Sequence, residues 1–170
     1  PGLMDTVLNV GLTDYGIELL AKKYGERFAY ETYARFLRSF GTSVFGIEGK
    51  DFGNMPLDLD VQSAKGLVEK YKKLIEGHGF KIPQDPYEQL KMAIKSVEDS
   101  WNSESAKKYR ADNGIPDDLG TAMIIQEMKF GNLNEKSGSF TFFTRDPNTG
   151  EKKPVIEYAP QSQGDDLVGG

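Results

Sequence analysis

Apolar positions recur at helical spacing through the first two-thirds of the chain. Tyr30, Tyr33, Leu37 and Phe40 follow one another at intervals of three or four residues, which places them on one face of a helix. A second segment repeats the pattern, with apolar residues at positions 67, 68, 71, 74 and 75. Residues 13–112 are therefore predicted to be mainly helical, and each of these two faces is predicted to be buried.

The best-marked helix begins near Asp85. Asp85 is a suitable N-cap, Pro86 suits the first turn, and Glu88 lies where its side chain can return a hydrogen bond to the cap. An apolar stripe then follows at Leu90, Ala93, Ile94 and Val97. Because Trp101 continues this stripe, we predict that it belongs to the core and not to a binding site.

The pattern becomes extended after residue 116. Residues 121–130 are apolar, residues 140–144 form an aromatic run, and residues 155–158 form another short run. Between the last two runs, residues 146–150 read Asp-Pro-Asn-Thr-Gly, which is typical of a turn. At least three strands are therefore predicted between residues 121 and 158.

This change of pattern divides the chain into two parts. We expect a mainly helical subdomain over residues 1–118 and a β-rich part over residues 119–170, which together give an α+β fold with a small antiparallel sheet. Within the helical part, residues 46–56 are rich in glycine and lack periodicity, so they are predicted to form a loop. A second break is predicted at residues 77–79, which read Gly-His-Gly.

Composition and charge exclude several classes of function. The formal net charge is −5, and the Lys and Arg residues are dispersed, so no basic stripe can follow a nucleic-acid backbone. No apolar run approaches the roughly 18 residues of a membrane-spanning helix. The chain has no cysteine, which excludes disulfides and thiolate sites and fits a reducing compartment. We expect a cytoplasmic protein that binds neither nucleic acid nor membrane.

The residues left for chemistry favour anions and hard cations. With His78 as the only histidine and no cysteine, a transition-metal site is not expected, and His78 is predicted to be a solvated loop residue. Ser137, Gly138 and Ser139 lie at the entrance to an aromatic strand, where small residues let backbone N–H groups approach a phosphate. The same triplet also suits a plain hairpin turn.

An acidic set follows the last predicted strand. Glu157, Asp165 and Asp166 are carboxylates of the kind that hold Mg²⁺ beside a nucleotide's phosphates. They are equally compatible with solvated acids in a polar tail.

Several segments resemble the pyruvate phosphate dikinase family, in the family's order. Residues 1–12 (PGLMDTVLNVGL) are similar to its MPGMMDTVLNLGL, and residues 27–41 (RFAYETYARFLRSFG) to its RFAYDSYRRFIQMFG. Residues 82–90 (IPQDPYEQL) resemble its FPQDPxEQL, and residues 163–168 (QGDDLV) its QGEDVV. Shorter matches are SWN, GTA, QEM with FGN, and FTRDP with TGEK. The chain is identified as an internal piece of that family's nucleotide-binding domain, and Pro1 is interpreted as a cut within a longer protein.

The resemblance implies an ATP-grasp fold, in which two lobes hold ATP and Mg²⁺ between them. It implies a transferase that interconverts ATP, phosphate and pyruvate with AMP, diphosphate and phosphoenolpyruvate. A phosphohistidine on a separate carrier domain of the same parent chain would carry the phosphoryl group, and the parent is expected to be a homodimer. The piece alone is expected to be inactive, because it lacks the carrier domain and the family's ATP-binding lysine and arginine.

Site residues are carried over motif by motif. Gly2 matches the glycine of a loop that closes over the phosphates, with Asp5 and Thr6 beside it. The segment that borders adenine is matched by Gln126, Glu127, Met128 and Lys129. The phosphate-binding turn is matched by Ser137, Gly138 and Ser139. The expected Mg²⁺ ligands are Asp165 and Glu157. No catalytic side chain is expected within the chain.

Two positions depart from the family. Phe140 stands where the family has the last glycine of the phosphate turn, and Asp165 stands where it has glutamate. The Phe140 ring would either obstruct a phosphate or pack into the strand that it opens. A second hypothesis therefore remains, a degenerate nucleotide-binding or interaction module without catalysis. A third is an enzyme similar to phosphoenolpyruvate synthase.

Overall fold

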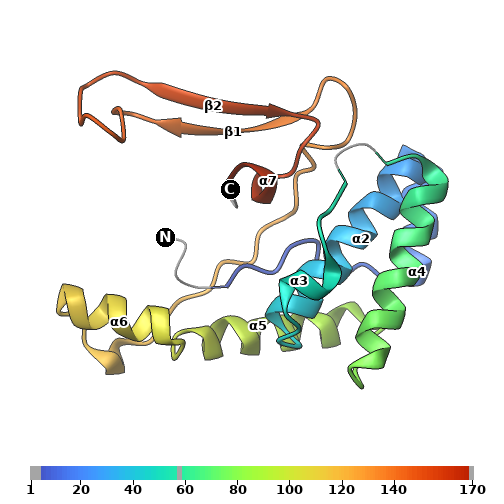
Figure 1. Cartoon of the computed structure of the whole chain (residues 1–170), viewed down its shortest axis with the longest axis horizontal. Coiled ribbons are helices and arrows are strands. Elements are labelled where there is room, and N and C mark those ends of the chain that lie inside the picture. The colour runs from blue at the N-terminus through green and yellow to red at the C-terminus, as the bar shows by residue number, and fades with distance from the viewer. Residues whose placement is uncertain (1–4, 57–58, 169–170) are drawn as a thin grey trace. The chain divides into compact units, whose positions relative to one another are not determined.

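The computed structural model describes residues 5–56 and 59–168. The chain separates into two compact units, residues 1–126 and residues 127–170, and each is described by itself. The first unit is helical, whereas the second is built on a β-hairpin (Figure 1). The α+β class is thereby confirmed. The functional division expected near residue 118 stays a prediction.

The first unit is mainly helical, as the sequence predicted for residues 13–112, and its described residues form six α-helices. They are α1 (Asp14–Tyr24), α2 (Glu26–Ser43), α3 (Gly49–Phe52), α4 (Val61–Gly77), α5 (Pro86–Ser100) and α6 (Glu104–Asn113), followed by a 3-10 turn at Asp117–Leu119. The short helix α3 corrects the prediction that residues 46–56 are entirely loop. The predicted break at residues 77–79 is confirmed, because α4 ends at Gly77.

Polar side chains fix where these helices begin. Thr13 accepts a hydrogen bond from the N–H of Gly16 at the start of α1, and Asp60 accepts one from Ser63 at the start of α4. The predicted cap at Asp85 is confirmed, since its carboxylate accepts from the N–H of Tyr87 at 2.8 Å. Each cap satisfies one of the backbone donors that a helix start leaves without an intrahelical partner.

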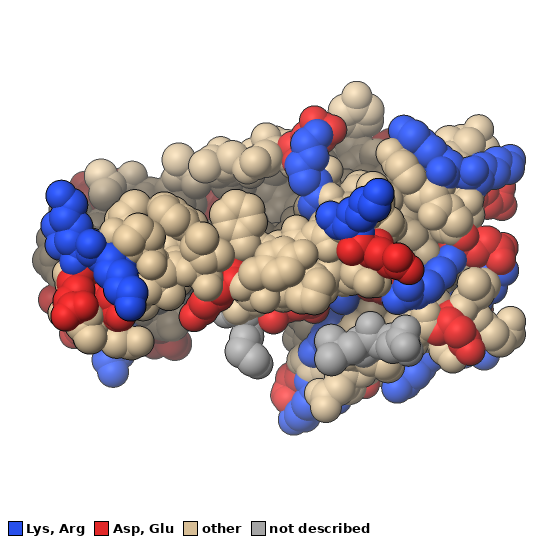
Figure 2. All heavy atoms as spheres, turned by 90° about the horizontal axis from the view of Figure 1, so that it is seen from above, with Lys and Arg blue, Asp and Glu red and all other residues tan. Residues whose placement is uncertain are grey.

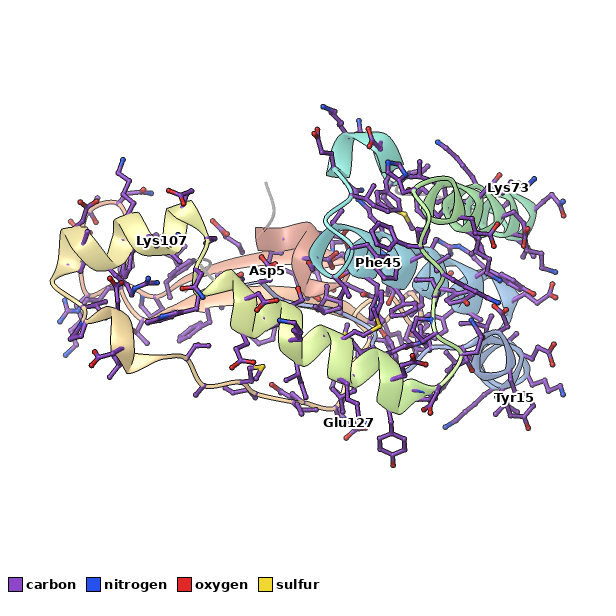
Figure 3. The ribbon with its side chains drawn as sticks, turned by 90° about the horizontal axis from the view of Figure 1, so that it is seen from below. Asp5, Tyr15, Phe45, Lys73, Lys107 and Glu127 are labelled. Carbon is purple, nitrogen blue, oxygen red and sulfur yellow. The ribbon has the colours of Figure 1, made fainter. Side chains whose placement is uncertain are left out.

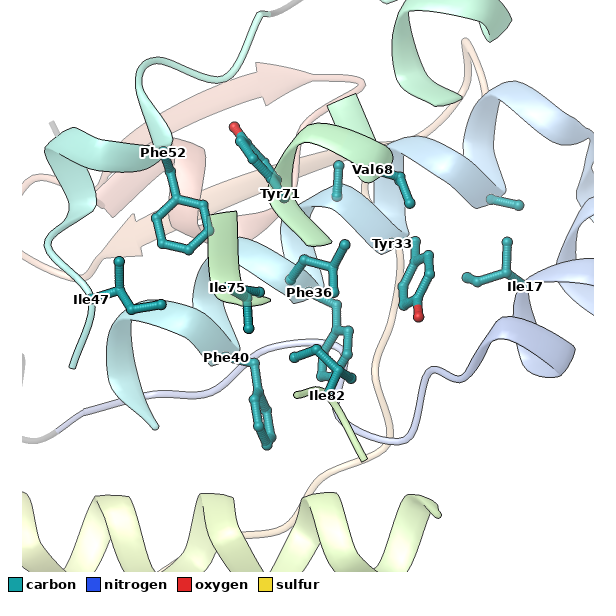
Figure 4. Packing of buried hydrophobic residues seen from close by; sticks show 13 residues of the cluster. Ile17, Tyr33, Phe36, Phe40, Ile47, Phe52, Val68, Tyr71, Ile75 and Ile82 are labelled. Atoms are coloured by element: carbon teal, nitrogen blue, oxygen red, sulfur yellow. The ribbon is translucent and has the colours of Figure 1, made fainter. Parts of the chain in front are cut away.

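Helix α2 supplies six of the thirteen residues in the buried cluster of the first unit, and it packs against both α1 and α4. Figure 4 shows Tyr33, Phe36 and Phe40 of α2 beside Tyr71 and Ile75 of α4. The buried cluster comprises Ile17, Ala29, Tyr33, Ala34, Phe36, Leu37, Phe40, Ile47, Phe52, Val68, Tyr71, Ile75 and Ile82. The two predicted apolar faces are therefore confirmed, with their outer members half-buried at Tyr30, Leu67 and Leu74.

Close packing within this core depends on one glycine. A Cβ atom at Gly41 of α2 would overlap the Phe52 ring of α3. Phe52 is 1% exposed and meets the Tyr71 ring edge-on at a centroid distance of 5.0 Å. Gly41 therefore allows α3 to approach α2 closely enough to bury Phe52.

Trp101 does not belong to this core, which corrects the sequence prediction. It is half-buried at the C-terminus of α5, with the guanidinium of Arg110 4.2 Å from its ring centroid. Its indole N–H donates to the carbonyl of Asp117 at 3.1 Å, and Arg110 forms an ion pair with the Asp117 carboxylate. Because α5 ends at Ser100, the last position of the stripe packs on the corner with α6 instead of on α2.

A buried polar residue joins α5 to the start of the chain. Gln89 is 0% exposed, and its carbonyl oxygen accepts from the N–H of Gly11 at 2.8 Å. Its amide donates to the carbonyls of Leu12 at 2.9 Å and Pro83 at 2.6 Å. A single side chain thus ties three segments together.

The second unit contains two strands within residues 121–158. Strands β1 (Gly138–Phe143) and β2 (Val155–Pro160) form an antiparallel hairpin, and α7 (Gly164–Val168) packs against both. The prediction of at least three strands is wrong, because residues 120–130 form no strand in the described structure. An apolar extended segment becomes a strand only when another strand pairs with its backbone, and no described strand does so here.

The hairpin unit is apolar outside and polar inside. In the register, Phe140 lies opposite Tyr158 and Phe142 opposite Ile156. These four side chains share one face of the hairpin and are 67%, 60%, 51% and 61% exposed, in that order. By contrast, the buried residues within the described range 127–167 are Asn132, Ser162 and Gln163.

Candidate functional site

The residues expected to bind the nucleotide are distributed over both units. Gly2 lies outside the described residues. Asp5 and Thr6 are exposed in the first unit, where the N–H of Asp5 donates to the hydroxyl of Ser100 at the end of α5 (Figure 3). Gln126 ends the first unit, and the remaining candidates lie in the second.

The segment expected to border adenine is extended but is not part of a strand. Gln126, Glu127 and Lys129 are exposed, and Met128 is half-buried. The ammonium group of Lys129 lies 2.8 Å from the Glu127 carboxylate, and its hydrogen bond and positive charge lower the pKa of Glu127. The segment therefore presents one apolar side chain and a mutually neutralising ion pair.

The expected phosphate turn lies where β1 begins, and its hydroxyls bond to the protein. The Ser137 hydroxyl donates to the Asn134 side chain at 3.2 Å, and the Ser139 hydroxyl donates to the carbonyl of Ser162 at 2.7 Å. A serine hydroxyl has one hydrogen to donate, and a phosphate binds through donors. The N–H of Ser137 is bonded as well, to the carbonyl of Asn134 at 2.9 Å, so in this arrangement neither these hydroxyls nor that N–H is available to an anion.

Gly138 is covered on one side by an aromatic ring. A Cβ atom at this position would lie 2.5 Å from Cε2 and 2.6 Å from the hydroxyl oxygen of Tyr158, so any larger residue would displace that ring. The phenol of Tyr158 thus covers one side of the turn, and no pattern in the sequence had pointed to this residue.

Phe140 does not pack into a core. Its ring is 67% exposed on the outer face of the hairpin, next to Tyr158, whereas Ser139 faces the opposite side of β1. The alternative in which Phe140 is buried with its strand is therefore wrong for the described residues. Obstruction of a phosphate stays a prediction, and it would apply to the side of the turn that Phe140 shares with Gly138.

The acidic candidates lie on β2 and α7 of the hairpin unit. Glu157 of β2 pairs with Thr141 of β1, so it shares the face of the hairpin that carries Ser139. Asp165 lies in the first turn of α7 and is exposed, while the Asp166 carboxylate accepts from the N–H of Gln163 at 2.9 Å. No group of three or more His, Asp or Glu residues in the described part of the chain is placed to hold a metal.

Two carboxylates nevertheless fit one kind of metal site. Mg²⁺ in nucleotide sites is commonly held by one or two carboxylates together with phosphate oxygens and water. Glu157 and Asp165 suit that role chemically, whereas they do not suit a cation that requires an all-protein set of ligands.

His78 is not one of the candidate site residues, and charges of both signs are mixed on the surface. Lysine, arginine, aspartate and glutamate side chains are interspersed on the face drawn in Figure 2, as dispersed charges in the sequence predicted. His78 lies at the C-terminus of α4, with Nε2 3.7 Å from the Asp51 carboxylate and 41% of its side chain exposed.

No helix of the described residues has the length and apolar character needed to cross a bilayer.

Sequence reasoning missed the polar cluster beneath the turn. The Gln163 amide donates to Asn132 at 3.1 Å, and the Ser162 hydroxyl donates to the carbonyl of Ala159 at 2.9 Å. Both Asn132 and Gln163 lie in motifs quoted above, FGN and QGDD, but a short motif does not reveal that its side chain is buried. The contact between these two motifs could be predicted only from the geometry of the hairpin.

Comparison with known proteins identifies the family. Residues 1–170 match the family described as "Pyruvate phosphate dikinase, AMP/ATP-binding domain". The chain is 47% identical over 183 residues to a chloroplastic pyruvate, phosphate dikinase of Flaveria trinervia, and 45% identical over 183 residues to one of Arabidopsis thaliana. All of this chain is covered in both cases, but 19% of each relative.

A third relative gives the same result. Pyruvate, phosphate dikinase 2 of Zea mays is 44% identical over 184 residues, which cover all of this chain and 21% of that protein. The chain thus spans about a fifth of the length of the curated relatives that it matches. Because the family match extends over every residue, the chain belongs to the pyruvate phosphate dikinase AMP/ATP-binding domain family.

Proposed function

We propose that this chain supplies part of the ATP-binding cleft of a pyruvate phosphate dikinase. The parent enzyme would convert ATP, phosphate and pyruvate into AMP, diphosphate and phosphoenolpyruvate. The observation that carries the proposal is the family match over residues 1–170, supported by relatives that are named as dikinases. The chain spans about a fifth of the length of those relatives, so most substrate-binding and catalytic residues of such an enzyme would lie in other parts of the parent.

Within that cleft, the turn at residues 137–139 would bind a phosphate chiefly through the N–H of Gly138, because the N–H of Ser137 already donates to the carbonyl of Asn134. The Tyr158 ring covers one side of Gly138, so the phosphate would approach the main chain from the other side. Asp5 and Thr6 would belong to a loop that closes over phosphates of the nucleotide. Residues 126–129 would border adenine, with Met128 as the apolar contact.

Glu157 and Asp165 would hold Mg²⁺, which neutralises charge on the phosphates during phosphoryl transfer when it is bound. Both carboxylates are exposed, and both belong to elements that pack together in the hairpin unit. This chain's contribution is then to bind and orient the nucleotide.

The rest of the proposal concerns the parent. It would have an ATP-grasp fold, pass the phosphoryl group to a phosphohistidine on a carrier domain, and form a homodimer. A cytoplasmic location remains the expectation from the sequence, although several relatives are named as chloroplastic. The chain alone would be inactive, because neither the carrier histidine nor the lysine and arginine of the other lobe occurs in it.

A degenerate module without catalysis is the second candidate. Phe140 favours it, since the exposed ring occupies the family's glycine position beside Gly138. The bonded hydroxyls of Ser137 and Ser139 favour it as well. A synthase-like parent is a third candidate that no structural observation favours.

Titration of the ¹⁵N-labelled chain with ATP, with and without Mg²⁺, tests the proposal. Charge-assisted hydrogen bonds contribute about 1.5–3 kcal/mol each. Without the two bonds that the lysine and arginine of the other lobe would make, the Kd for ATP should be about millimolar or weaker. We expect chemical-shift changes at residues 137–139 and 126–129 at high ATP. Micromolar affinity would contradict the incomplete site, and changes confined to other residues would contradict the assigned one.

A further inference from the structure

The residues buried in the hairpin unit are polar, and they lie directly behind the candidate phosphate turn. Asn132 is 8% exposed, Ser162 8% and Gln163 0%. Polar side chains contribute less to stability on burial than apolar ones of the same size, so a buried polar group is better suited to fixing a geometry. The outer face of the same hairpin exposes Phe140 and Tyr158, so the unit contains large aromatic side chains but does not bury them.

The first link in this cluster joins two loops that are far apart in sequence. The Gln163 side-chain amide donates to Oδ1 of Asn132 at 3.1 Å, across 31 residues. The N–H of Gln163 donates to the carboxylate of Asp166 at 2.9 Å, which orients the start of α7. Asn132 thus holds the segment that leads from β2 into the acidic helix.

The second link joins that segment to the turn itself. The Ser139 hydroxyl donates to the carbonyl of Ser162 at 2.7 Å, and the N–H of Gln161 donates to the carbonyl of Ser137 at 2.9 Å. Gln161 has φ of 48°, a left-handed conformation that a residue other than glycine adopts at some energetic cost. The backbone therefore bends sharply here to bring Ser162 beneath the turn.

Gly131 is where the two links meet. A Cβ atom at this position would overlap the carbonyl oxygen of Ser162 and would lie 2.5 Å from the Ser139 hydroxyl oxygen. The neighbour of Asn132 in the FGN motif thus touches both the turn and the segment behind it.

We propose that Asn132 is a positioning residue for the phosphate turn, acting through Gln163. By holding residues 162 and 163 in place, Asn132 fixes the carbonyl that receives the Ser139 hydroxyl and so fixes the backbone of residues 137–139. The same contact sets the position of Asp165 relative to that turn. This inference rests on the proposed function for its purpose, but the geometry that it describes can be tested without a nucleotide.

Hydrogen exchange in three variants of the chain provides the first test. Asn132→Ala removes the acceptor, whereas Asn132→Asp keeps an oxygen that can accept from Gln163. Asn148→Ala makes the same chemical change at an exposed position in the hairpin loop. Hydrogen exchange at amides of the first unit, which should be the same in every variant, serves as the internal control.

We expect Asn132→Ala to accelerate exchange at the Gln161 and Gln163 amides about tenfold or more, because local opening controls exchange. Amides of residues 141–143 should change less than about twofold, as should all hairpin amides in Asn148→Ala. Asn132→Asp should stay within about threefold of the unmodified chain. A uniform change along the hairpin, no change, or equal effects of Ala and Asp would overturn the positioning role.

Addition of 10 mM Mg·ATP (roughly ten times a millimolar Kd) separates this inference from the proposed function. Shifts at residues 137–139 in the unmodified chain and in Asn132→Asp, but not in Asn132→Ala, support the inference. Equal shifts in all three overturn it and leave the proposed function standing. If no protein shows shifts, the proposed site fails, and hydrogen exchange alone decides whether Asn132 orders the turn.

Discussion

The helical unit and the hairpin unit place their apolar residues in opposite ways. In the helical unit Phe36, Phe40 and Tyr71 are 0% exposed and form one continuous cluster. In the hairpin unit Phe140 and Tyr158 are largely exposed, and the buried positions are polar. Both units have aromatic residues in plenty, so the difference lies in placement and not in composition.

This contrast indicates how each unit is stabilised. Burial of apolar surface is the dominant favourable term in folding, whereas an intramolecular hydrogen bond contributes little net free energy. An isolated two-stranded hairpin is marginally stable in water. The helical unit should therefore account for most of the cooperative unfolding of the chain, and the hairpin unit should open first.

Truncation of a core aromatic should give the largest loss of stability. Phe36→Ala removes a ring that is 0% exposed and should destabilise the helical unit by about 3–5 kcal/mol. Phe142→Ala removes a ring that is 51% exposed and should cost less than about 1 kcal/mol. Thermal unfolding followed by circular dichroism measures both. Similar losses in the two variants would mean that the hairpin face is buried in solution.

Substitution of Gln89 tests the polar contact inside the helical unit. Gln89→Glu keeps the acceptor for Gly11 but cannot donate to Leu12 and Pro83, so we expect a loss of about 2–4 kcal/mol in urea denaturation. Gln62→Glu, on the exposed surface of α4, is the matched control and should change stability by less than about 0.5 kcal/mol. A neutral Gln89→Glu would show that the three segments are joined by other contacts.

Two helical glycines distinguish the effect of close packing from that of backbone freedom. Gly41→Ala should destabilise the chain by about 1–3 kcal/mol, since the added Cβ displaces the Phe52 ring. Gly66→Ala is made in a helix with no atom near the new Cβ, so it should stabilise by about 0.4–1 kcal/mol. Chemical denaturation of both variants gives the sign directly. Stabilisation by Gly41→Ala would contradict the close approach of α2 and α3.

The smallest expected effect concerns pH. Burial raises the pKa of Asp14. Hydrogen bonds from Lys72 and Tyr33, together with the positive charge of Lys72, lower it by more, so the pKa is shifted downward from 3.8. A lowered pKa in the folded state contributes stability above the unfolded value, which is lost as pH falls through the folded value.

Asp14→Asn should therefore reduce stability at pH 7 by less than about 1 kcal/mol, because Asp14 is largely exposed. The difference from the unmodified chain should disappear below about pH 3. Denaturation at both pH values measures it. A difference that grows on acidification would refute the assigned sign.

Local patterns in the sequence predicted most of the helical unit. The faces at Tyr33 and Val68, and the cap at Asp85, depend on residues within a turn or two of each other, which periodicity detects. Trp101 was misplaced because its position depends on Arg110 and Asp117, beyond the end of its helix. The contact of Gln89 with Gly11 spans 78 residues and leaves no local pattern.

The candidate site was predicted as a set of motifs, but its geometry was not. The position of Ser137, Gly138 and Ser139 at the start of β1 agrees with the expected strand entrance. The hydroxyl bond from Ser139 to Ser162 could not be foreseen, since it depends on a tight turn at Gln161. Residues 121–130 failed as a strand for a related reason, because pairing is decided by a partner and not by the segment itself.

Contacts between the start of the chain and α5 impose an order on folding during synthesis. The N–H of Asp5 is bonded to Ser100, that of Gly11 to Gln89 and that of Asp14 to Gln84, across 95, 78 and 70 residues. On a ribosome the first of each pair emerges long before its partner. Helices α1, α2 and α4 can associate early because their contacts are shorter in sequence, but the N-terminal segment must wait for α5. A translational pause before residue 100 would thus leave the face of α2 that contacts α5 exposed to solvent.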